Sequence, residues 1–160
     1  MKARLEREEA LEIIRELILD ASLCMLVTDE QYGKETRPMV TIELDSEGNI
    51  WLFAAKFYKH IAAVNPRSTV QLVYAHPSKD SFMSIKGNVN ILYDKEQIKE
   101  KWNQIMNASF PNGLYDIELC CLVKMRIEEA AYWNSESERL IPIYKNESAT
   151  ETYDQDILAA

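Results

Sequence analysis

Cysteine and histidine are scarce in this chain of 160 residues, and their scarcity excludes several kinds of chemistry. The three cysteines, Cys24, Cys120 and Cys121, are odd in number and form no CxxC pair, which argues against a disulfide framework or a zinc site and favours a reducing compartment. His60 and His76 lie far apart and have no serine or carboxylate companions in a recognisable arrangement. We therefore expect no metal site and no catalytic side chain of the histidine-dependent kind.

A basic surface and a membrane segment are also missing. The formal net charge is −8 and the pI is about 4.9, so the broad positive footprint of a protein that binds nucleic acid or anionic lipid is absent. No apolar run approaches the length of a membrane span, and residues 1–9 alternate in charge without the apolar centre of a signal peptide. These observations predict a cytoplasmic protein whose partner is a small molecule or another protein.

The length and the distribution of polar residues predict one domain followed by a tail. A chain of this length buries a core without disulfide or metal staples. Residues 1–144 carry the periodic apolar patterns, whereas residues 145–160 are acidic and polar. We expect the first range to form the domain and the second to be a loosely held C-terminal tail.

Several short alternating segments, interrupted by helices only at intervals, predict a mainly β, α+β fold. Helical spacing covers residues 5–21, residues 56–64 and a segment that Asp94 can cap and that ends before Phe110. The expected strands are residues 22–28, 35–44, 50–54, 69–74, 82–92 and 119–127, and Gly87 inside the fifth indicates a bulge or a close backbone approach. Such a pattern is typical of an antiparallel barrel of about six strands with peripheral helices. Because side chains fill so small a barrel, a ligand is expected outside it, at a subunit interface.

Residues 35–63 are the stretch around which the chain is organised, since they read as strand, turn, strand and short helix. Alternation places apolar side chains on one face of the first strand and mostly polar ones on the other, with Val40, Ile42 and Leu44 opposite Arg37, Met39, Thr41 and Glu43. One face is expected to pack and the other to be free for a ligand. The turn at residues 45–49 contains Gly48, and Arg37 and Lys59 flank the hairpin as two cations suited to an anion.

A series of short motifs resembles the pyridoxamine 5′-phosphate oxidase-like flavoproteins, and most closely the general stress protein 26-like group. The pieces follow one another in the family's order from about residue 10 to about residue 140: Cys24-Met25-Leu26-Val27-Thr28, Thr36-Arg37-Pro38-Met39, Trp51-Leu52-Phe53, Lys59, Asn65-Pro66, Ile85-Lys86-Gly87, Tyr93-Asp94-Lys95, Trp102, Phe110-Pro111 and Tyr132-Trp133. The force of the resemblance comes from their order and spacing rather than from any one piece.

The resemblance implies a split β-barrel homodimer that binds FMN in two grooves at its interface. Residues like Arg37 and Lys59 hold the FMN phosphate in that family, while the backbone at positions like Pro38, Met39, Val40, Phe53 and Ala54 lines the flavin ring. Trp133 and, less closely, Trp102 correspond to aromatic residues that approach the cofactor from the partner subunit.

The chain also departs from the family pattern, which leaves two functions open. Ala55 stands where the family usually has a hydroxylated residue, Tyr132-Trp133-Asn134 replaces a commoner aspartate ending, and the segment before Phe110 lacks a usual tryptophan. No set of residues specifically matches pyridoxamine phosphate. The first hypothesis is an FMN-dependent oxidoreductase whose substrate and electron donor are open. The alternative is a non-catalytic module that binds or senses flavin, haem or a deazaflavin on the same scaffold, and a weaker third is a structural dimer with an empty groove.

Overall fold

The computed structural model describes most of the predicted domain. The described residues are 6–21, 23–30, 33–55, 69–76, 81–103, 106–107, 110, 112–134, 136, 138–139 and 141–146. The predicted helix at residues 56–64 and most of the predicted tail lie outside them, so the domain boundary at residue 144 stays a prediction.

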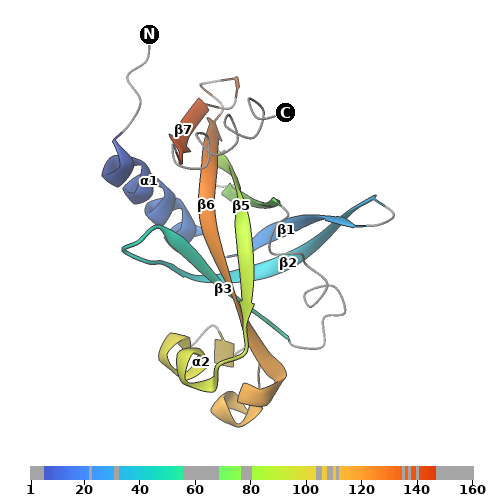
Figure 1. Ribbon diagram of the computed structural model, residues 1–160. Helices are drawn as coiled ribbons and strands as arrows, with labels where there is room; N and C mark the ends of the chain where they lie inside the picture. The colour runs from blue at the N-terminus through green and yellow to red at the C-terminus, as the bar shows by residue number, and fades with distance from the viewer. Residues whose placement is uncertain are drawn as a thin grey trace, which may run out of the picture.

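Six antiparallel strands close into a barrel, which confirms the predicted fold. In chain order the elements are α1 (Arg7–Asp20), β1 (Leu23–Glu30), β2 (Gly33–Leu44), β3 (Asn49–Ala55), β4 (Val70–His76), β5 (Ser81–Leu92), α2 (Lys95–Lys101), the 3-10 helix η2 (Gly113–Leu119), β6 (Cys120–Asn134) and β7 (Ile141–Lys145). The strand order is β3-β2-β1-β4-β5-β6-β7, and an additional pairing of β3 with β6 closes the ring. Figure 1 shows β6 running the length of the molecule, from the α2 end to the β7 end.

The barrel interior is the main core, and α1 covers it. Residues from all seven strands form one buried apolar cluster, which Leu11, Ile14 and Ile18 of α1 join. Polar side chains inside it are paired, with a 2.6 Å hydrogen bond between the hydroxyls of Thr41 and Tyr74 and a 3.8 Å contact between the Cys24 thiol and the Thr41 hydroxyl. Buried hydroxyls are tolerated when they are paired in this way, so the interior is a packed core rather than a ligand cavity.

A second apolar cluster covers the outer face of β3 and of the first part of β6. It consists of Trp51, Phe53, Ile98, Met106, Phe110, Cys120 and Leu122. Strand alternation explains the division, since Ile50, Leu52 and Ala54 of β3 belong to the interior cluster. Both faces of these strands are therefore buried.

The predicted division of β2 into two faces is wrong beyond Thr41. Val40 and Ile42 pack against the second cluster, but Leu44 belongs to the interior cluster together with Met39. The cause is a bulge, because the register with β3 shifts between Thr41 and Glu43 and inserts one extra residue. The face that the alternation left free for a ligand is, at Met39 and Thr41, the inside of the barrel.

Three other local predictions are confirmed, and two elements differ. Gly48 in the β2–β3 turn has φ +88°, Asp94 caps α2 by accepting from the Glu96 N–H, and a bulge occurs at Gly87. Helix α2 ends at Lys101, where Trp102 turns extended, instead of continuing towards Phe110. Strand β7 was not predicted; it pairs with β6, and its proline suits an edge strand.

Candidate functional site

Six of the eight predicted cofactor residues lie where β2 separates from β3. Pairing between these strands reaches Val40 and Phe53 and is not continued by β3 beyond that pair, while β3 goes on pairing with β6 as far as Ala55 and Cys120. On its other side, β2 remains paired with β1 from Val40 back to Gly33. The two strands therefore open into a wedge, and the β1–β2 hairpin projects beyond the barrel (Figure 1).

The wedge leaves one backbone edge of β2 open. From residue 33 to residue 39, no strand among the described residues pairs with the edge of β2 that faces β3. Pro38 lies in this stretch, and a proline without an N–H is tolerated at such an edge. Alternate backbone groups of an antiparallel strand point to each neighbour, so this edge offers N–H and C=O groups to a planar ligand.

Arg37 places a guanidinium at the same position. It points to the interior side of the sheet, only 5 % of its surface is exposed, and its Nη2 donates to the Thr28 hydroxyl at 3.3 Å. Thr28 is itself buried on β1. A guanidinium held in this way is suited to a bidentate contact with phosphate, and Thr28 is a supporting residue that the sequence pattern did not reveal.

The side chains of the remaining wedge residues pack in the two apolar clusters, so their backbone rather than their side chains borders the wedge. Met39 and Ala54 are buried in the interior cluster, and Phe53 is buried in the second cluster with its ring centroid 5.9 Å from that of Phe110. Val40 packs against the same cluster. Their side chains fix the positions of β2 and β3, which agrees with the role that the resemblance gives to these positions.

The other two predicted cofactor residues are Lys59 and Trp133. Lys59 lies outside the described residues. Trp133 lies near the end of β6 with its ring centroid 5.1 Å from that of Phe82, its register partner on β5. Trp102 packs against the second cluster, and its Nε1 donates to Asn107 Oδ1 at 2.7 Å.

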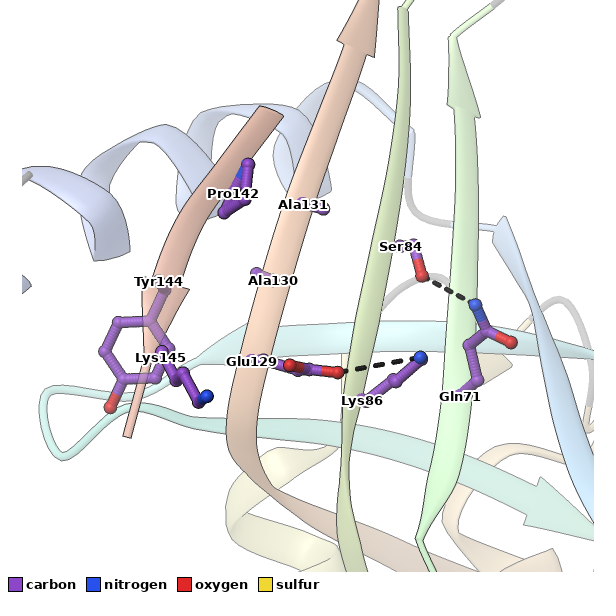
Figure 2. A pocket seen from close by; sticks show the side chains of 9 residues that line it. All are labelled: Gln71, Ser84, Lys86, Glu129, Ala130, Ala131, Pro142, Tyr144 and Lys145. Carbon is purple, nitrogen blue, oxygen red and sulfur yellow. Dashed lines mark hydrogen bonds and ion pairs between the residues drawn. The ribbon is translucent and has the colours of Figure 1, made fainter. Parts of the chain in front are cut away.

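The outer face of β4, β5, β6 and β7 is arranged in three cross-strand rows. The aromatic row contains Phe82 and Trp133, the small row contains Ser84, Ala131 and Pro142, and the charged row contains Gln71, Lys86, Glu129 and Lys145. Together with Ala130 and Tyr144, the small and charged rows line a hollow of about 360 Å³ (Figure 2). The hollow could not be predicted from the sequence because it depends on β7.

Exposed apolar side chains continue from the aromatic row onto β1. Phe82 is 38 % exposed, Met25 37 % and Leu23 60 %. Met25 is in register with Val73 of β4, which in turn is in register with Ser84. Leu23, Met25 and Phe82 thus mark an apolar patch that adjoins the hollow.

The thiols are unsuited to act as nucleophiles. Burial raises the pKa of Cys24 to about 11, and burial together with the neighbouring Cys121 raises that of Cys120 to about 12. Only the thiolate is reactive, so both remain protonated at neutral pH. Within the described residues there is also no group of three or more His, Cys, Asp or Glu that could hold a metal ion, and no helix long and apolar enough to cross a membrane.

A small closed barrel in which β2 separates from β3 beside a buried arginine is the architecture of the split-barrel fold. The family model described as "Pyridoxamine 5′-phosphate oxidase like" matches residues 9–155. The chain belongs to this family, as the order of its motifs indicated. No curated protein matches the chain significantly.

Solved structures agree with this assignment. A Clostridium acetobutylicum protein related to general stress protein 26 of B. subtilis has a TM-score of 0.74 and 17 % identity, with 89 % of this chain and 99 % of that chain covered. The general stress FMN/FAD binding protein of Xanthomonas citri has a TM-score of 0.66 and 25 % identity, with coverages of 87 % and 98 %. A pyridoxamine 5′-phosphate oxidase-related, FMN binding protein of Nostoc punctiforme has a TM-score of 0.61 and 10 % identity, with coverages of 89 % and 91 %.

Proposed function

We propose that this protein binds FMN in the wedge between β2 and β3 and acts as a flavin-dependent oxidoreductase. The observation that carries the proposal is the convergence of Arg37 and the open edge of β2 at the end of the β2–β3 pairing. A phosphate requires fixed cationic donors, and a flavin ring requires a flat edge with backbone donors and acceptors. The FMN-binding descriptions of the Xanthomonas citri and Nostoc punctiforme proteins support the same cofactor.

In this proposal the protein binds and orients the cofactor. Arg37, with Lys59, holds the phosphate, and the backbone from Pro38 to Val40 and at Phe53 and Ala54 lies along the ring. When bound, FMN supplies hydride or electron transfer at flavin N5. No side chain of the chain is required as a nucleophile, in keeping with the protonated thiols.

We also propose that the protein is a homodimer with a cofactor groove at each end of the interface. The apolar patch of Leu23, Met25 and Phe82 is the surface that a second copy would cover, because contiguous exposed apolar patches mark interaction sites. Trp133 adjoins this patch, so it would approach the partner's cofactor as the resemblance implies. A single sedimenting monomer at micromolar concentration would contradict the dimer.

Cofactor retention tests the proposed function directly. Purified protein is incubated with FMN and desalted, and the visible absorption spectrum of the retained flavin is measured. Arg37→Ala is expected to weaken binding about 10- to 100-fold, since a hydrogen bond to a charged group contributes about 1.5–3 kcal/mol. The matched control is Lys34→Ala, which removes an exposed cation of the same hairpin that pairs with Asp29.

The folded state of the variant is checked by circular dichroism, because Arg37 is buried. Wild-type protein that retains no FMN and shows no thermal shift with it would refute FMN binding. Equal loss in Lys34→Ala would show that net charge, rather than the wedge, governs retention.

The non-catalytic alternative rests on Ala55. This residue ends β3, where the family usually has a hydroxyl, so one phosphate contact is missing. Repeated reduction of the bound flavin by NAD(P)H and reoxidation by an acceptor would exclude a purely binding role. Retention of haem or a deazaflavin in preference to FMN would favour the alternative.

A further inference from the structure

The hollow on the outer face of β4–β7 has the charge, size and position of a small-ligand site. Its volume of about 360 Å³ lies within the usual range for small-molecule pockets. Its floor is low because Ser84 and Ala131 are small and lie opposite each other in register. Larger side chains rise from the charged row and from Tyr144, as Figure 2 shows.

The charged row gives the hollow a local positive balance. Lys86 and Lys145 are the register partners of Glu129 on its two sides, and Lys86 Nζ lies 3.6 Å from Glu129 Oε1. Two lysines and one glutamate thus lie next to one another in this row, in a chain whose net charge is −8. An anionic group is the ligand that this local excess favours.

The small row supplies the remaining features of the site. Gln71 Nε2 donates to Ser84 Oγ at 2.6 Å, which leaves the Ser84 hydroxyl hydrogen and the Gln71 carbonyl for a ligand. Ala131 and Pro142 are flat and apolar. A planar ring lying over them would present a carboxylate to Ser84 and the two lysines.

The hollow lies close to Trp133, the residue that would approach the proposed cofactor of the partner subunit. Ala131 and Trp133 point to the same side of β6 and are two residues apart, roughly 7 Å along the strand. We propose that the hollow is the substrate pocket and that it takes small planar carboxylates, an assignment that rests on the proposed function because Trp133 would adjoin the partner's flavin.

The test uses full-length protein, with and without added FMN, and the fluorescent probe 2-aminobenzoate. Its uncharged analogue 2-aminobenzamide has nearly the same shape and is expected to bind up to about fivefold more weakly. Ala131→Leu is expected to abolish probe binding by filling the floor, and Lys145→Ala to weaken it about fivefold. Lys34→Ala, outside the hollow, is the control and should leave the dissociation constant unchanged.

Glu129→Gln is the most informative variant. If Glu129 only supported the structure, its replacement would weaken probe binding, whereas the proposal predicts tighter binding. Removing the carboxylate that competes for Lys86 is expected to tighten probe binding about two- to fivefold. In FMN-loaded protein the probe should also perturb the flavin absorption bands, and Ala131→Leu should prevent this while leaving FMN retention intact.

The outcomes separate the two proposals. FMN retention without probe binding, or probe binding unaffected by Ala131→Leu, would overturn the substrate pocket and leave the proposed function standing. Probe binding with the expected variant pattern, but no FMN retention, would overturn the proposed function and the substrate role with it. If Ala131→Leu converts a dimer to monomers, the hollow is filled by the second copy and the assignment is wrong.

Discussion

The two halves of β6 differ in the exposure of their outer side chains. Its first half pairs with β3, and residues 120–123 are buried on both sides, Cys121 and Val123 inside the barrel and Cys120 and Leu122 beneath the second cluster. Its second half pairs with β7 on the same edge, and its outer side chains lie at the surface. A strand face becomes available to ligands where no helix covers it.

A core substitution in the covered half should have the largest effect. Leu122 is fully buried on the outer face, so Leu122→Ala is expected to lower the free energy of unfolding by about 2–5 kcal/mol in urea titrations. Glu129→Ala, on the same face of the open half, should change it by less than about 0.5 kcal/mol, because its ion pair with Lys86 is exposed. Equal losses would abolish the distinction between the halves.

The bend between the halves should be the next most sensitive point. Glu128 is the extra residue of the bulge opposite Lys86 and Gly87, and a Cβ on Gly87 would lie 2.0 Å from the Arg126 carbonyl oxygen. Gly87→Ala is therefore expected to cost about 1–3 kcal/mol, measured as a lowered thermal midpoint. Asn90→Ala, exposed on the same strand, is the control, and an unchanged midpoint in Gly87→Ala would show that the bulge tolerates a side chain.

Burial changes the pKa values of the cysteines, which gives a test of that burial through the pH dependence of stability. Burial raises the pKa of Cys24 from 9.0 to about 11. The folded state therefore favours the thiol, and this contribution to stability is complete below pH 9 and is lost as the pH rises to about 11. We expect stability to fall over this interval, and to fall less in Cys24→Ala.

Thiol labelling at pH 8 gives an independent check on the same burial. Because the free cysteines are buried on both faces of the barrel wall, a thiol reagent should label them only in denaturant. Fast labelling of native Cys120 would show that the second cluster opens readily.

The smallest expected effect concerns the β2–β3 turn. Partial burial acts to raise the pKa of Asp45, but hydrogen bonds from Trp51 Nε1, from the backbone and side chain of Asn49 and from the Glu47 N–H hold it below 3.8. The stabilisation is present above that value and is lost as the pH falls through the lower folded-state pKa. Asp45→Asn should therefore be less stable at pH 7 and show a shallower loss below pH 4, as followed by tryptophan fluorescence.

Most of the barrel could be predicted because its signals are local. Alternation in β5, the turn at Gly48 and the cap at Asp94 each depend on a few neighbouring residues. The bulge in β2 could not be predicted, because the register with β3 places the extra residue and the strand's own alternation continues through it. Helix α2 ends at Lys101 because Trp102 is extended, although Ile98, Trp102 and Met106 keep helical spacing and Met106 and Asn107 are helical again.

Some features of the candidate site could likewise be predicted from the sequence, and others could not. The order of motifs identified the family and singled out Arg37 and the backbone around Pro38, because a phosphate and a flat ring restrict which residues serve them. Local patterns in the sequence were enough to predict the six barrel strands and the family. Three features required the folded structure: the point where β2 leaves β3, the support of Arg37 by Thr28, and the charged hollow that β7 borders beside Trp133. Strand pairing brings these residues together, and their separation along the chain carries no signal of that contact.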